Sequence, residues 1–304
     1  MSLEQVELLT VAGIINGSFY ALLGAGFGLV LGVTGRFHYA FALVFTLAAY
    51  VASTLQTAAG WLAPAAVSAG LMAAVILGTA IERFVYRPLA HASGPLSLLT
   101  IFISSLGLTI AGVNLITLAW TAFSRTIDLV PMRPFHIRQV NFTSLDVALV
   151  AVSWLLIAVL SGMLKFTDLG RSVRAVRSNP SLARVIGLDS DAIYLSVFAI
   201  SSLLCGIAGI LDGARYAVQP NMGIRPVVFA FVVAFLGGTR SGPFVVGLAG
   251  LFIGLIESWS GLFVSPQWSS LVVFSVLFVY LVLRPNDWRS LGFGALTPIR
   301  LVKR

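Results

Sequence analysis

Charged residues are scarce in this chain of 304 residues, since Asp, Glu, Lys and Arg make up only 10% of it. An average soluble domain has about a quarter of its residues charged. Hydrophobic residues instead reach 58% and the mean hydropathy is +0.98. The uncharged runs are each near the roughly 20 residues that a bilayer-spanning helix needs. We therefore predict an all-α polytopic membrane protein with about eight or nine passes, one of them a short broken helix, rather than a barrel of short alternating strands.

The sequence lacks the residue patterns that several kinds of chemistry require. The lone Cys205 lies in an apolar run, which excludes a disulfide framework and a thiol metal site. The three histidines are far apart and form no His-Glu-x-x-His, so no metal site is expected. Neither lysine follows a Gly-x-x-x-x-Gly loop, so the chain itself should bind no ATP or other cofactor. No serine lies in Gly-x-Ser-x-Gly, which weakens an intramembrane hydrolase, and we assign no catalytic residue.

Charge concentrates in one place, residues 165–191, which we call the basic segment. It lies between two uncharged runs of membrane length, and it contains Lys165, Arg171, Arg174, Arg177 and Arg184. Basic loops between spans face the cytoplasm. The net charge of +8 then reflects membrane topology, and no nucleic-acid partner is needed to explain it.

A short helix is expected inside the basic segment. Asn179 before Pro180 is typical of an N-cap followed by proline at the first helical position, and Gly187 is placed to end the helix after about two turns. Leu182 and neighbouring apolar residues flank Arg184, so one face suits a groove on a soluble partner. The alternative is a solvated loop that only obeys the charge rule for cytoplasmic loops.

The remaining sequence divides into apolar runs. No Lys or Arg precedes Arg36, so the first span should be retained rather than cleaved as a signal peptide. We expect spans at 8–35, two within 39–81 separated near Gly60, one at 92–124, then 147–164, 192–211 and 226–239, one starting after 241–242, and a last one ending at Arg284. Residues 82–91 are expected to form a basic turn and 125–146 a loop.

The segment 226–239 is short for a membrane crossing. If it crosses, most of the 19 Lys and Arg residues lie on the side of the basic segment; if it does not, that side holds the minority. The charge rule therefore favours crossing, with nine passes, the N-terminus outside and the C-terminus in the cytoplasm.

Polar and small residues within the spans suggest two further roles. Polar groups in hydrocarbon must find partners or line an aqueous path, so we place on a candidate substrate path Asn16, Ser18, Tyr20, His38 and Asn114. Glycines four residues apart share a helix face and allow close helix packing. Those expected to do so are Gly24, Gly28, Gly32, Gly209, Gly213, Gly250 and Gly254.

Three stretches resemble one family. They are Gly170-Arg-Ser-Val-Arg-Ala-Val-Arg-Ser-Asn-Pro-Ser-Leu-Ala-Arg-Val-Ile-Gly-Leu-Asp, with Cys205-Gly-Ile-Ala-Gly-Ile-Leu-Asp-Gly after it; Glu82-Arg-Phe-Val-Tyr-Arg-Pro-Leu; and Phe235-Leu-Gly-Gly-Thr-Arg-Ser-Gly-Pro-Phe through Glu257. In order and over nearly the whole chain, they resemble permease subunits of bacterial ABC importers of the branched-chain amino-acid type.

This resemblance implies a single transmembrane permease domain, 1–304, in the bacterial inner membrane. Its basic segment would be the cytoplasmic coupling loop, which docks on an ATP-binding-cassette ATPase subunit. The residues then assigned to ATPase coupling are Arg171, Arg174, Arg177, Asn179, Pro180, Leu182, Arg184 and Gly187. The resemblance also implies a second permease subunit, identical or homologous, and a periplasmic substrate-binding protein. ATP would be bound only by the partner ATPase subunits.

One departure from the family leaves the solute open. Where the family usually has Asn-Phe-Ala-His-Gly, this chain has His38-Tyr-Ala-Phe-Ala42. Branched-chain amino acids lead a list that includes urea, short amides and other small organic acids. The chief alternative function is an ion-coupled secondary transporter, which would be expected to place carboxylates in mid-span, whereas Asp212 and Glu257 lie near predicted span ends. A structural membrane scaffold and an intramembrane enzyme are further alternatives.

Overall fold

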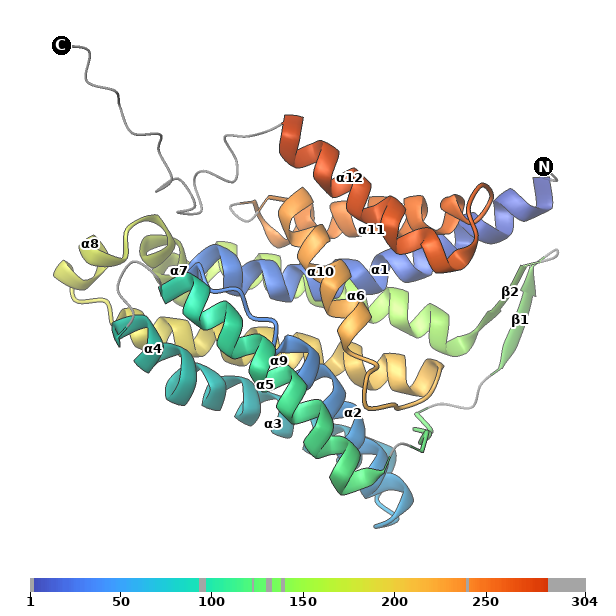
Figure 1. Cartoon of the computed structure of the whole chain (residues 1–304), viewed down its shortest axis with the longest axis horizontal. Helices are drawn as coiled ribbons and strands as arrows, with labels where there is room; N and C mark the ends of the chain where they lie inside the picture. The colour runs from blue at the N-terminus through green and yellow to red at the C-terminus, as the bar shows by residue number, and fades with distance from the viewer. Residues whose placement is uncertain are drawn as a thin grey trace.

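The chain folds into a bundle of helices (Figure 1). The computed structural model describes residues 3–92, 97–121, 123–129, 133–137, 140–238 and 241–283. The helices in these ranges are α1 (Leu3–Thr34), α2 (Phe41–Thr57), α3 (Ala63–Ile81), the π-helix η1 (Glu82–Tyr86), α4 (Arg87–Ala92), α5 (Ser97–Trp120), α6 (Ser144–Phe166), α7 (Asp168–Ser178), α8 (Pro180–Val185), α9 (Ser190–Arg215), α10 (Ile224–Leu236), α11 (Pro243–Ser260), the 3-10 turn η3 (Pro266–Trp268) and α12 (Ser269–Leu283). Six helices of the described residues are long and apolar enough to cross a membrane, and three shorter ones are also apolar. The all-α polytopic class is thus confirmed.

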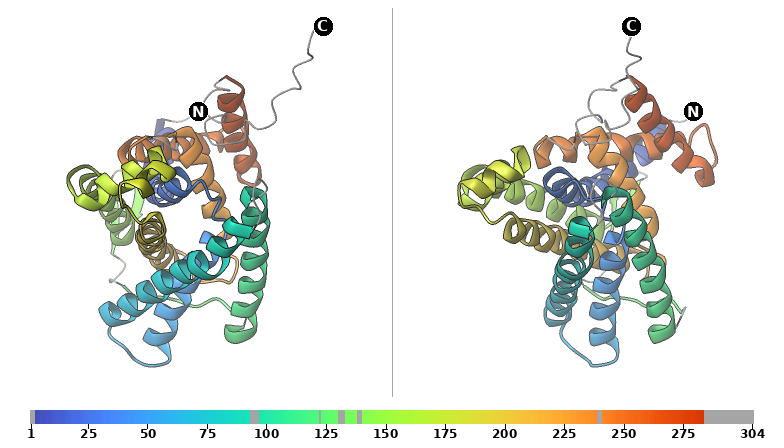
Figure 2. Two further views of the ribbon diagram at one scale, coloured as in Figure 1. Left: turned by 90° about the vertical axis from the view of Figure 1, so that its left-hand side faces the viewer. Right: turned by 60° about the vertical axis from the view of Figure 1, so that its left-hand side comes forward.

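The first helix forms the centre of the bundle. Ala21, Leu22 and Val30 of α1 are fully buried, and α1 packs against α6, α9, α10 and α11. In the two turned views α1 runs through the middle, with α12 on one flank and α2, α3 and α5 projecting on another (Figure 2). The segment nearest the N-terminus is therefore the hydrophobic core around which the later helices assemble.

The bundle has two ends, which we name by their contents. The basic end carries α7 and α8, and the hairpin end carries a two-stranded antiparallel hairpin, β1 (Pro134–Ile137) and β2 (Val140–Thr143), as Figure 1 shows. At the hairpin end the loop after α5 contacts α2 and the link that follows α9. Ser53 Oγ donates to the Thr126 carbonyl at 2.9 Å, and Arg125 pairs as a backbone bridge with Val218.

The predicted basic turn at 82–91 is wrong, because the helix continues through it. α3 is followed directly by η1 and then by α4, so residues 63–92 form one long helical rod. Charge suggested a turn, but Glu82 is buried in an ion pair with Arg36 and is not exposed in a loop. Pro88 lacks the N–H that a regular helix needs, and the wider π turn lies just before it.

Two other expectations need correction. The stretch 125–146 is not only a loop, since it contains the β-hairpin and the first turn of α6. Thr143 caps the N-terminus of α6 in a capping box with Asp146. This motif starts the helix at Ser144, before the uncharged run predicted as the span 147–164. The basic segment holds two helices rather than one, because Thr167 caps α7 before Asn179 caps α8. Parts of the predicted loop 125–146, the last residue of the predicted span 226–239 and the chain from residue 284 onward lie outside the described residues.

Candidate functional site

Two helices at the basic end present most of the predicted coupling residues. α7 buries Val173 and Val176 against the bundle and exposes Arg171 and Arg174. Arg171 pairs with Asp168 one turn before it, and Arg174 donates to the carbonyl of Leu164 near the end of α6. α7 is thus an amphipathic helix that lies on the bundle by its valines and turns arginines outward.

The next helix, α8, turns apolar side chains outward. The Asn179 side chain accepts from the Leu182 N–H at 3.0 Å, and Gly187 has φ +87°, as the sequence predicts for the cap and the terminating glycine. Ala183 alone is buried, whereas Leu182, Val185 and Ile186 are 59%, 81% and 68% exposed. Arg184 is also exposed. The free face of α8 is therefore apolar with a cation on it, at the tip of the basic end.

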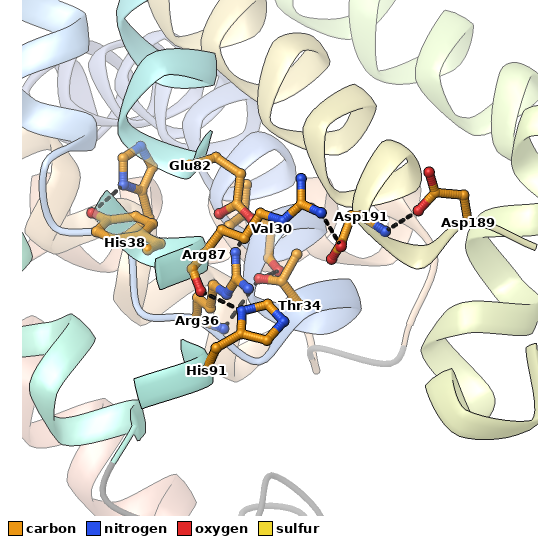
Figure 3. A network of polar contacts seen from close by, with 10 residues as sticks. Val30, Thr34, Arg36, His38, Glu82, Arg87, His91, Asp189 and Asp191 are labelled. Atoms are coloured by element: carbon orange, nitrogen blue, oxygen red, sulfur yellow. Dashed lines mark hydrogen bonds and ion pairs between the residues drawn. The ribbon is translucent and has the colours of Figure 1, made fainter. Parts of the chain in front are cut away.

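A polar cluster lies where the link between α1 and α2 meets η1 (Figure 3). Arg36, in the link between α1 and α2, forms an ion pair with Glu82 of η1, and both side chains are almost fully buried. His38 Nδ1 lies 2.8 Å from the Tyr86 hydroxyl, and burial lowers the pKa of His38 to about 3. A histidine held neutral in this way has a structural hydrogen bond rather than a proton to exchange near neutral pH.

The five candidate path residues do not share one site. Asn16 accepts from Arg215 at 3.0 Å, Ser18 Oγ accepts from Trp154 Nε1 at 3.1 Å, and the Tyr20 ring stacks on Phe229 with 4.7 Å between centroids. His38 lies at the basic end, as described above. Asn114 is exposed on α5 and donates to the Ile110 carbonyl of its own helix at 2.8 Å. Asn16, Ser18 and Tyr20 thus lie on one stretch of α1 but have different neighbours.

Two ion pairs near the hairpin end were not anticipated. Arg215 Nε of α9 lies 2.6 Å from Asp146 Oδ1 of α6, and Arg225 Nη2 of α10 lies 2.8 Å from Glu257 Oε1 of α11. The sequence places these residues near span ends, but no pattern in it predicts which carboxylate pairs with which arginine. Asp146 and Glu257 are buried, so each carboxylate is neutralised by an arginine instead of water.

Most of the predicted packing glycines lie at close helix contacts. A Cβ on Gly254 would overlap Gly17 of α1, and one on Gly250 would lie 2.5 Å from Ala21 Cα. A Cβ added to the other glycines would approach one neighbour each, which is Val233 for Gly24, Ala234 for Gly28, Phe45 for Gly209 and Val218 for Gly213. Gly32 is half-buried in the last turn of α1. Gly13 and Gly17 form the α1 side of the contact with α11 and are not among the predicted packing glycines.

A large cavity near the basic end is lined, as far as the structure describes the chain, by uncharged side chains alone. It measures about 960 Å³ and lies among α1, α5, α10 and α12, where Phe27, Phe102, Phe231 and Phe278 contribute to its walls. A zwitterionic or ionic solute would find no partner for its charges there. The cavity suits apolar matter rather than a polar cargo.

The comparisons with known proteins indicate the same family. Residues 9–282 match the family described as branched-chain amino acid transport system / permease component. The high-affinity branched-chain amino acid transport system permease protein LivH of Escherichia coli (strain K12) is 29% identical over 295 residues, covering 90% of this chain and 92% of LivH. The corresponding protein BraD of Pseudomonas aeruginosa is 27% identical, covering 91% of this chain and 93% of BraD. No solved structure matches. The family match and the helical fold lead to one conclusion: the chain belongs to the branched-chain amino acid transport system permease family.

Proposed function

We propose that this chain forms half of a translocation path for a branched-chain or similar amino acid. A second permease chain supplies the other half, a periplasmic binding protein delivers the solute at the hairpin end, and separate ATPase subunits drive the cycle from the basic end. The chain binds no ATP itself. LivH and BraD, whose names give branched-chain amino acid transport, support the solute class.

The observation that carries the proposal is the outward face of α8. Leu182, Val185 and Ile186 are more than half exposed on a helix whose caps hold it in one conformation. Exposed apolar groups of this size on a short helix are typical of a helix that lies in a groove of another protein. Arg184 on the same helix adds a cation that an acidic or carbonyl-rich groove can bind.

The buried carboxylates count against ion-coupled secondary transport. A proton carrier needs a carboxylate that changes its protonation state during the cycle. Glu82, Asp146 and Glu257 each form an ion pair with an arginine of another part of the chain, as carboxylates with a structural role do. This arrangement supports structural ion pairs and an external energy source.

Reconstitution tests the proposal. The purified chain, with the ATPase and second permease subunits that copurify with it, is placed in liposomes, and leucine uptake is measured with the binding protein present. We expect uptake only when ATP reaches the ATPase side. Liposomes with the chain alone and an imposed proton gradient are the control. Robust proton-driven uptake without any ATPase would overturn the proposal.

A further inference from the structure

The first turns of α9 contact two separate parts of the bundle. Asp191 Oδ2 lies 2.5 Å from Arg87 Nη2, at the junction of η1 and α4 (Figure 3). One turn later, the Tyr194 ring lies under the Arg36 guanidinium, 5.2 Å from its Cζ to the ring centroid. Because α9 follows α8 after only a short link, Asp191 and Tyr194 lie in the part of α9 that a displacement of α8 would move first.

Arg36 connects these contacts to the core. Its guanidinium lies between the Tyr194 ring of α9 and the Glu82 carboxylate of η1, while its backbone N–H donates to Thr34 Oγ1 at 3.2 Å at the end of α1. The central helix, the 63–92 rod and the start of α9 therefore meet at one residue, Arg36. The π-helix η1 carries Glu82 in this junction, and such wide turns inside helices are frequent at functional sites.

The outer contact of the junction is accessible to water. A cleft of about 140 Å³ is lined by Glu82, Arg83, Arg87, Asp189 and Asp191 among others. The side chains of Arg87 and Asp191 are 42% and 22% exposed. Ion pairs this exposed contribute little to global stability. The Arg87–Asp191 pair joins the start of α9 to the rod, and its loss should leave the fold intact.

We propose that Arg87–Asp191, together with Arg36 held between Glu82 and Tyr194, is a latch that transmits displacement of α8 to the 63–92 rod and to α1. These are positioning residues for transport and do not contact the solute. The inference rests on the proposed function, because it assigns to α8 an ATPase partner whose closure moves it. With the latch intact, a shift of α8 moves three elements together. With the latch broken, α8 moves alone and ATP hydrolysis is uncoupled from opening of the path.

A charge swap tests the latch in the reconstituted complex. The variants are Arg87→Asp, Asp191→Arg and the two combined. The control is Arg83→Gln, which removes one positive charge from the same cleft without adding a carboxylate, at an exposed arginine of η1 that forms no ion pair among the described residues. Leucine uptake per ATP hydrolysed is measured beside the yield of copurified ATPase. We expect each single variant to lower uptake per ATP at least about fivefold, the low end of coupling between sites, at unchanged ATPase yield.

The double variant restores the pair with its partners exchanged. It should recover most of the wild-type ratio, somewhat less than all because an arginine in the first turn of α9 opposes the helix dipole. The Arg83→Gln variant should resemble wild type. Single variants that couple normally, or a double variant as uncoupled as the singles, would overturn the latch while wild-type uptake still upheld the proposed function. A wild-type complex without ATP-driven uptake would overturn both.

Tyr194 provides a second, independent test that needs no charge change. Tyr194→Phe keeps the ring under Arg36, and Tyr194→Leu removes it. We expect the leucine variant alone to lose uptake per ATP. Equal behaviour of the two variants would show that the ring contact takes no part in transmission.

Discussion

Single glycines set how closely α1 approaches its neighbours. Gly17 of α1 and Gly254 of α11 lie backbone against backbone, and Gly13 lies against Leu255 in the same way. Helices in a membrane gain no hydrophobic energy by leaving lipid, so their association depends on this close packing. At these positions the two helix backbones touch because no side chain separates them.

We therefore predict that Gly254→Val disrupts the α1–α11 contact. Its side chain would have to occupy the space of Gly17, and overpacking of this kind typically costs about 1–3 kcal/mol or more. The measurement is the thermal midpoint of the detergent-solubilised protein. Gly107→Val is the matched control, because Gly107 is exposed within α5 and a Cβ there meets nothing within 4 Å. Equal losses in the two variants would refute the packing role.

At the scale of elements, α7 and α8 expose different kinds of side chain at the basic end. α7 lies on the bundle through two valines and exposes arginines, whereas α8 holds only Ala183 against the bundle and exposes its larger apolar residues. This difference makes α8 the better candidate for the partner's groove. Charge alone would have favoured α7.

Replacing Arg184 by Glu, or Gly187 by Val, should abolish transport without unfolding the chain. Arg184→Glu reverses the charge offered to the ATPase, and Gly187→Val places a β-branched residue at φ +87°, which costs roughly 1 kcal/mol or more. A Cβ at 187 meets no atom within 4 Å, so steric overlap does not contribute. ATPase copurification and leucine uptake are the readouts.

Arg133→Glu is the control for this experiment, since it makes the same charge reversal on an exposed residue beside β1 at the hairpin end. It should leave the copurified ATPase unchanged. If the Arg184→Glu/Gly187→Val protein binds its ATPase and transports as wild type does, α8 is only a solvated part of the loop.

For the whole molecule, contacts between helix ends define two opposite ends. Arg225 at the start of α10 reaches Glu257 late in α11 and Ser269 at the start of α12, while Gly237 at the end of α10 lies against Val246 early in α11. α10 therefore runs antiparallel to α11. The ion pair of Asp146 with Arg215 likewise joins the start of α6 to the end of α9.

We predict that the basic end faces the cytoplasm and the hairpin end the periplasm. In a Cys205→Ala background, a cysteine at exposed Ser178 should react with impermeant thiol reagents only from the cytoplasmic side, and one at exposed Ala59 only from the periplasmic side. Intact cells and inverted membrane vesicles provide the two sides. Labelling of both residues from the same side, or a reversed pattern, would contradict this orientation.

The sequence by itself determined the class, the approximate spans and the local ends of helices. Apolar length predicts spans because a bilayer has a fixed thickness. Asn179, Pro180 and Gly187 predict the limits of α8 because capping depends on a few consecutive residues. The charge of the basic segment and its motif also pointed to the family that the comparisons show.

Only the tertiary structure decided which polar side chains meet. Glu82 suggested a turn because a carboxylate is costly inside a helix bundle, and only its contact with Arg36 shows what offsets that cost. The pairs Asp146 with Arg215 and Glu257 with Arg225 follow from which helix faces pack together, and Gly17 matters because α11 crosses α1 there. Such contacts depend on the relative placement of helices far apart in the chain, whereas spans and caps depend on neighbouring residues alone.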